Sequence, residues 1–87
     1  MITARVGEAV SLALPETPGT GYRWRLLSPL KVLSDEFHPS ADTPGAAGER
    51  VFVVEVSEPG RHELAAELAR PWETTVRESR SFVVEAR

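Results

Sequence analysis

Apolar and polar residues alternate along most of the chain, which is the pattern of β-strands with one buried face. The first clear case runs from Glu8 to Leu14 and is closed by Pro15. A second runs from Tyr22 to Leu26 and directs Trp24 toward the core, with an arginine on either side of it. A short, irregular strand is expected from Leu30 to Phe37. The first half of the chain is therefore predicted to be extended.

The second half continues the same pattern. Arg50 to Val56 alternates through Phe52, and valines on its opposite face indicate a long central strand that is covered on both sides. Pro59 and Gly60 suit the two central positions of a type II turn, so the chain is expected to fold straight back on itself there. A last strand is predicted from Ser81 to Ala86.

The segment from His62 to Ala69 is ambiguous, because it is rich in helix-forming residues. Leu64, Ala66 and Leu68 also alternate with their neighbours, as a strand requires. We predict a strand, since a hairpin turn normally delivers a strand partner. With an initial strand from Ile2 to Val6, the chain has about seven short strands, which is typical of an antiparallel β-sandwich. The predicted fold class is all-β.

Three connections of this sandwich are predicted to lie together. If each strand reverses the direction of its predecessor, alternate connections emerge at one end. These are the connections around residues 15–21, 39–48 and 70–77, which are also the ones rich in Pro, Gly or aromatic residues. Loops on a rigid scaffold are common sites of recognition, so this end is predicted to be a binding surface.

The aromatic residues of these connections divide by environment. Trp24 alternates with Leu26 and is expected in the core. Tyr22 is as consistent with packing at the end of the sandwich as with exposure, because its ring is apolar and its hydroxyl is polar. Trp72 lies between Pro71 and a polar run, so we expect it in solvent.

Composition narrows the possible functions. The 87 residues, 41% of them hydrophobic, make one small domain, residues 1–87, with little interior for an enclosed active site. The net charge of −3, with both signs interleaved, offers no basic face for nucleic acid. The chain has no cysteine, its two histidines stand apart, and it carries no local nucleophile motif. We therefore expect no enzyme activity, no catalytic residue, no metal and no cofactor, and a small hydrolase is disfavoured.

The expected location follows from what the sequence lacks. Its first residues have no apolar run of the kind found in signal peptides, and no stretch approaches the roughly 20 apolar residues of a membrane span. We expect a cytoplasmic monomer without membrane attachment, exported only if a leader has been trimmed.

Three motifs carry a family resemblance. The run PGTGYRW, from Pro18 to Trp24, resembles the Asn-Pro-Thr-Thr-Gly-Tyr-x-Trp loop of the chagasin family, which inhibits papain-like cysteine peptidases. The run GAAG, from Gly45 to Gly48, resembles that family's Gly-x-Gly-Gly loop, and Arg70 to Trp72 matches its Arg-Pro-Trp loop. The order and spacing of the motifs extend the resemblance from Glu8 to Arg87.

The resemblance implies an immunoglobulin-like sandwich whose three loops enter the cleft of a papain-like cysteine peptidase and block it reversibly, without covalent chemistry. Thr20 and Gly21 would form the central tip near the catalytic thiol, flanked by the other two loops. The residues that the resemblance assigns to the peptidase contact are Thr17, Pro18, Gly19, Thr20, Gly21, Tyr22, Gly45, Ala46, Ala47, Gly48, Arg70, Pro71 and Trp72.

Three positions depart from the family pattern. Thr17 stands where the family has Asn, and its hydroxyl is expected to tie the loop less completely than an amide. Gly19 replaces Thr and makes the tip smaller and more flexible, and Ala47 replaces Gly although alanine tolerates positive φ poorly. These departures leave an alternative open: an immunoglobulin-like protein-binding or adhesion module that no longer inhibits peptidases.

Overall fold

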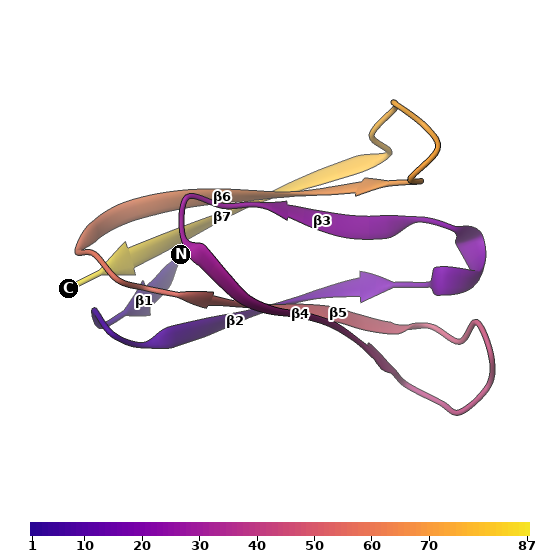
Figure 1. The fold of residues 1–87 in the computed structure, drawn as a ribbon, viewed down its shortest axis with the longest axis horizontal. Helices are drawn as coiled ribbons and strands as arrows, with labels where there is room; N and C mark the ends of the chain where they lie inside the picture. Colours follow the sequence, from indigo (N-terminus) through magenta and orange to yellow (C-terminus); the bar gives the residue numbers. More distant parts are fainter.

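The computed structural model describes all residues from 1 to 87 and consists of two packed β-sheets with no α-helix (Figure 1). Its elements are β1 (Ile2–Ala4), β2 (Ala9–Glu16), the 3-10 turn η1 (Pro18–Thr20), β3 (Arg23–Leu27), β4 (Lys31–Pro39), β5 (Gly48–Glu55), β6 (Gly60–Ala69) and β7 (Glu78–Ala86). The four-stranded sheet has the order β1-β7-β6-β3 and the three-stranded sheet the order β2-β5-β4. Only β1 and β7 pair in parallel. The predicted all-β sandwich is confirmed, and no helix is long and apolar enough to cross a membrane.

The alternating apolar residues meet between the two sheets and form one core. The largest fully buried side chains are Trp24, Phe52, Leu14, Val54, Val56 and Val84. Burying a side chain of this kind stabilises the fold by about 1.5–3 kcal/mol. Trp24 is only 2% exposed, as predicted, and its indole Nε1 donates a hydrogen bond of 2.7 Å to the Pro15 carbonyl. The core is thus closed at this point without leaving a polar atom unpaired.

The segment from His62 to Ala69 is a strand, as predicted, and forms most of β6. It does not pair with β5, although a hairpin turn between the two would have made them partners. β6 pairs with β3 and β7, whereas β5 pairs with β2 and β4 along both of its edges. With neither edge of β5 free, the turn that ends at Gly60 carries the chain across to the opposite sheet. The positive φ of Gly60, 111°, fits the sharp reversal predicted there.

Strand β2 extends beyond Pro15, where the sequence pattern ended it, and includes Glu16. Proline lacks a backbone N–H, but β2 lies at the edge of its sheet, where an unpaired position is tolerated. The predicted irregularity of β4 is confirmed as a register shift between Val32 and Ser34, but the strand is not short, because it continues to Pro39 and has nine residues. The extra two residues of β2 matter, because they bring Glu16 inside the sandwich.

Three connections emerge at one end of the molecule, on the right in Figure 1. The central loop (residues 17–22) crosses from the three-stranded to the four-stranded sheet. The glycine loop (residues 40–47) joins β4 to β5 within the first of these sheets, and the tryptophan loop (residues 70–77) joins β6 to β7 within the second. This three-loop end therefore has one loop from each sheet on either side of a loop that bridges them.

Candidate functional site

The central loop is closed on itself by hydrogen bonds. The Thr20 and Gly21 N–H groups donate to the carbonyls of Thr17 and Pro18, at 3.1 and 2.9 Å. The Thr20 hydroxyl also donates to the Thr17 carbonyl at 2.7 Å, and Gly21 leaves the turn at a φ of 81°. The Thr17 side chain makes no capping hydrogen bond, as expected for threonine in place of asparagine. The hydroxyl of Thr20 supplies the tie instead.

The tryptophan loop is fastened to the central loop through Arg70. Its Nε donates to the Thr20 carbonyl at 3.1 Å, and its Nη1 pairs with Glu73 at 3.2 Å. The Arg70 guanidinium also lies 4.4 Å from the ring centre of Tyr22, and that of Arg77 lies 4.9 Å from the same ring. Tyr22 is accordingly half-buried. The arginine of the Arg-Pro-Trp motif thus connects the two loops through Nε and Nη1.

Trp72 is 72% exposed, as predicted, and it rests against Gly21. A Cβ placed on Gly21 would lie 2.8 Å from Cη2 of the Trp72 indole, closer than van der Waals contact allows. Gly21 is therefore required twice, for its positive φ and for the space that the indole occupies. The largest exposed aromatic side chain of the protein is held at the edge of the tip.

The glycine loop approaches the central loop through backbone atoms. A Cβ on Gly19 would lie 3.4 Å from the Gly45 carbonyl oxygen, and one on Gly45 would lie 3.7 Å from the Gly19 Cα. The glycine loop is closed at its base, where the Ser40 N–H donates to the Ala47 carbonyl at 3.0 Å. Small residues on both loops therefore let two backbones pack side by side.

Two glycine-loop positions differ from expectation. No residue other than glycine has a positive φ, so Ala47 is accommodated without the strain that the missing glycine suggested. Gly48 lies within β5, where a Cβ would collide with the His38 carbonyl oxygen. Gly48 thus permits strand pairing with β4, and it does not belong to the loop surface.

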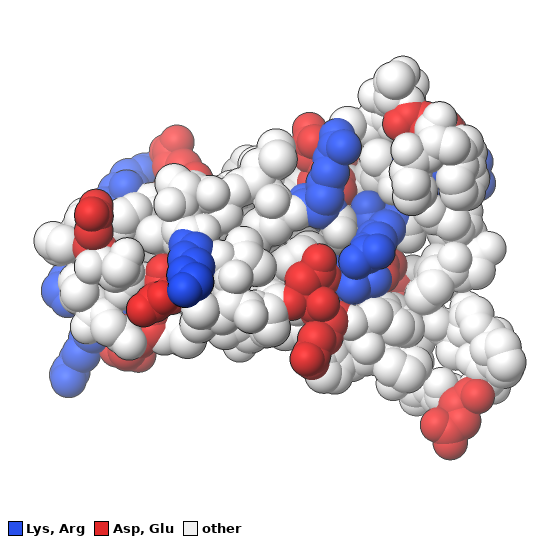
Figure 2. Space-filling model, viewed as in Figure 1, with Lys and Arg blue, Asp and Glu red and all other residues white.

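The predicted contact residues gather at the three-loop end but differ in exposure. Those that are exposed are Thr17, Pro18, Gly19, Thr20, Gly45, Ala47, Pro71 and Trp72. Those that are partly buried are Gly21, Tyr22, Ala46, Gly48 and Arg70. On the face shown in Figure 2, charged side chains of both signs are scattered over the strands, and the three-loop end shows uncharged atoms with acidic groups at its upper and lower corners.

Beneath the loops lies an ion network that the sequence reasoning missed. Glu16 and Arg50 are only 4% and 8% exposed, and Nη2 of Arg50 lies 2.8 Å from Oε2 of Glu16. Arg50 Nη1 lies 3.0 Å from Oδ1 of Asp35, and Oε1 of Glu16 accepts a hydrogen bond of 2.8 Å from the Trp24 N–H. Burial lowers the pKa of Arg50, but the hydrogen bonds and charges of Glu16 and Asp35 outweigh it, so that the pKa is raised overall. Arg50 is therefore a permanent buried cation.

A signal for this network was present in the sequence. Glu16 continues the inward alternation of Leu12 and Leu14, and Arg50 continues that of Phe52 toward the start of β5. One acidic and one basic residue at the ends of two inward-facing rows indicate a buried pair, because an isolated buried charge is too costly. Ending the first strand at Pro15 concealed it.

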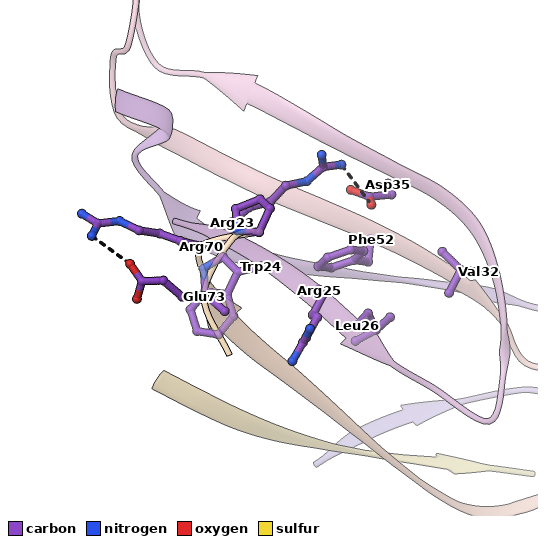
Figure 3. A pocket seen from close by; sticks show the side chains of 11 residues that line it. Arg23, Trp24, Arg25, Leu26, Val32, Asp35, Phe52, Arg70 and Glu73 are labelled. Atoms are coloured by element: carbon purple, nitrogen blue, oxygen red, sulfur yellow. Dashed lines mark hydrogen bonds and ion pairs between the residues drawn. The ribbon is translucent and has the colours of Figure 1, made fainter. Parts of the chain in front are cut away.

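A hollow of about 450 Å³ lies beside the tryptophan loop, between β3 and β4. Trp24, Leu26 and Phe52 are among its lining residues. Figure 3 shows two ion pairs at its rim, Arg23 with Asp35 at 3.7 Å and Arg70 with Glu73 at 3.2 Å. The charges at this rim are thus partnered within the chain.

Comparison with known proteins adds a family to this geometry. The family model described as chagasin family peptidase inhibitor I42 matches residues 3–86. Chagasin of Trypanosoma cruzi is 32% identical over 92 aligned residues, which cover 95% of this chain and 84% of chagasin. The crystal structure of the cysteine protease inhibitor EhICP2 from Entamoeba histolytica has the same fold, with a TM-score of 0.83 at 20% identity over 99% of this chain and 85% of that one. The solution structure of Amebosin gives a TM-score of 0.59 at 23% identity, over 98% and 84%. The match along almost the whole chain shows that this protein belongs to the chagasin family, which consists of peptidase inhibitors and not of enzymes.

Proposed function

We propose that this protein inhibits papain-like cysteine peptidases reversibly, by inserting its three-loop end into the active-site cleft without covalent chemistry. Membership of the chagasin family supports peptidase inhibition, and the chagasin-like loop motifs support the papain-like class. One observation carries the loop mechanism: three loops far apart in the sequence are packed on one another at one end. Gly19 lies against Gly45, and Trp72 lies against Gly21. Together they make a single projecting surface that can enter a cleft as one body.

The tip is suited to a close approach by an enzyme surface. The exposed glycines Gly19 and Gly45 carry no side chains that would hold a peptidase backbone away. Thr20 stands at the centre of this surface and is exposed, although its carbonyl and hydroxyl are already engaged within the loops. We assign the central contact to Thr20 and Gly21 and the flanking contacts to the other two loops.

Trp72 is the anchor that we expect to contribute most to affinity. Tryptophan offers a large apolar contact area and is enriched among the residues that dominate binding energies. Its indole is fixed on one side by Gly21, so little side-chain entropy is lost when a peptidase covers the other side. Arg70, by contrast, acts by holding the loops together, because its Nε donates to the Thr20 carbonyl and its Nη1 to Glu73.

The loops are ordered by the protein's own hydrogen bonds, which favours tight and reversible binding. Preorganised loops lower the entropy that is lost on association, so a small surface can bind well. The three-loop end is complete within one chain, and we therefore propose that the inhibitor acts as a monomer.

Titration of the purified protein into papain and into several cathepsin-like peptidases tests the proposal. We expect competitive inhibition, with KM raised and kcat unchanged, and full recovery of activity on dilution. A serine peptidase provides the specificity control. Undiminished activity of every cysteine peptidase at inhibitor concentrations on the order of 10 μM would reject the proposal and favour the adhesion-module alternative.

A further inference from the structure

We infer that Glu16, Arg50 and Asp35 are positioning residues, which fix the central loop and the glycine loop relative to each other and so control inhibition without touching the peptidase. We call these three side chains the loop-base network. The inference rests on the proposed function for its effect on inhibition. Its effect on the loops themselves can be measured on the free protein.

The loop-base network lies where both loops begin and end. Glu16 is the last residue of β2, directly before the central loop, and its carboxylate accepts the N–H of Trp24, the second residue of β3 after that loop. Arg50 follows the glycine loop near the start of β5, and Asp35 lies on β4, the strand that leads into it. One set of side chains thus links the strands that flank both loops.

Only arginine can contact Glu16 and Asp35 at the same time in this geometry. Nε of Arg50 lies 3.1 Å and Nη2 lies 2.8 Å from Oε2 of Glu16, while Nη1 donates to Asp35 at 3.0 Å. The guanidinium also lies 5.8 Å from the ring centre of Phe37. A planar fork with several donors can make these contacts at once, whereas the single ammonium of lysine cannot. The positions of three strands are therefore set by one rigid group.

The third loop is connected to the same unit. The central loop, whose ends Glu16 joins, presents the Thr20 carbonyl to Nε of Arg70, which in turn holds Glu73 of the tryptophan loop. Polar contacts thus join the strands that flank the glycine loop to those that flank the central loop, and the central loop to the tryptophan loop. Displacement at the loop base is expected to reach all three.

Stability alone does not account for a buried ion network. Replacement of a buried ion pair by apolar residues of similar volume is often neutral or stabilising, so such a pair is weak evidence of a stabilising role. The best-attested use of buried polar groups is to select one arrangement among several. No buried side-chain nitrogen or oxygen lacks a hydrogen-bond partner here, so the network specifies a single geometry.

Two variants separate positioning from stability. Arg50→Met leaves Glu16 buried without its partner, so it should lower both Tm and loop order. The double variant E16M/R50M removes both buried charges but also the acceptor of the Trp24 N–H, so its Tm should recover only part of the way toward that of the wild type while the loops stay loose. In both variants the backbone order parameters of Thr20 and Ala46 should fall from about 0.85 toward about 0.6, as measured by nitrogen-15 relaxation on the free protein. If the binding-competent arrangement falls to about a tenth of the population, Ki against papain rises about tenfold.

Two control variants lie away from the three loops: one lowers stability, and the other breaks an ion pair. Val84→Ala lowers Tm through a core cavity in β7, and Arg61→Met breaks the exposed Arg61–Glu63 ion pair on β6. Neither should change loop order or Ki. The inference is overturned if E16M/R50M has the loop order and Ki of the wild type, or if Val84→Ala raises Ki as much as Arg50→Met does. If the wild type inhibits no cysteine peptidase, the proposed function fails, while the relaxation data still decide whether the network orders the loops.

Discussion

The two ends of the sandwich use glycine in the same conformation but in different surroundings. Gly21 and Gly45 at the three-loop end, and Gly7 and Gly60 outside it, all have positive φ. A side chain added to Gly7 or Gly60 would meet no atom within 4 Å, whereas one on Gly21 would meet the Trp72 indole and one on Gly45 would approach Gly19. Away from the three loops, glycine only turns the chain. At the three-loop end it also makes room for another loop, which is the difference expected between a connector and a binding surface.

Ion pairs also differ between the two regions: the Arg50–Glu16 pair near the three loops is buried, whereas the Arg61–Glu63 pair away from them is exposed. Breaking the buried pair should have the largest effect on stability. Arg50→Met is expected to reduce the free energy of unfolding by about 3–5 kcal/mol, because it leaves the buried Glu16 unpaired. Arg61→Met, which breaks the exposed Arg61–Glu63 pair, should cost about 0–1 kcal/mol. Urea denaturation of both variants measures the two values. Equal losses would contradict the distinction between the two regions.

The pH dependence of this effect follows from the raised pKa of Arg50. A group whose pKa is higher in the folded state gives its full stabilisation below its unfolded pKa and loses it only as the pH rises through the folded pKa. Arg50 therefore stays charged throughout the neutral and mildly alkaline range. The deprotonation of Arg50 should add no slope to unfolding free energy in this range, which urea denaturation at a series of pH values can check.

The two regions also differ in what their exposed apolar side chains are expected to do. Trp72→Ala should weaken peptidase inhibition by about 2–4 kcal/mol, the loss typical of a tryptophan that anchors an interface, while Tm changes little because the indole is 72% exposed. Leu27→Ala, on a side chain that is 51% exposed and outside the three loops, should leave Ki unchanged. Ki measured against papain for both variants tests this. Inhibition that is insensitive to Trp72→Ala would remove the tryptophan loop from the contact surface.

The two glycine environments predict a smaller but more specific difference. Gly21→Ala and Gly60→Ala should each lower the free energy of unfolding by about 1–2 kcal/mol, because both positions have a positive φ. Only Gly21→Ala should also raise Ki, since its methyl group displaces Trp72. Thermal unfolding and Ki, measured on the same two proteins, separate backbone strain from crowding. A rise in Ki for Gly60→Ala would show that strain alone disturbs the tip.

The fold and the grouping of the loops were predictable from the sequence, because alternation and turn residues act locally. Strand pairing was harder to predict. We expected β6 to pair with β5, yet β2 and β4 already occupy both edges of β5. Such competition between partners is a property of the whole sheet. The loop-base network was missed for a related reason, since the tolerance of Pro15 in β2 depends on that strand being at an edge.

Ala47 is a case where the sequence suggested a problem that the structure does not have. It replaces a glycine of the family's Gly-x-Gly-Gly loop, which suggested backbone strain, but its φ is not positive. The positive φ in the glycine loop belongs to Gly45, and Ala47 has none. Restoring the family residue with Ala47→Gly should therefore relieve nothing, and it should cost about 0.5–1 kcal/mol because glycine loses more backbone entropy on ordering. We expect a slightly lower Tm and an unchanged or slightly raised Ki. Stronger inhibition by Ala47→Gly would mean that the loop reaches the peptidase in a conformation that alanine disfavours, so the three-loop end would not be fully preorganised.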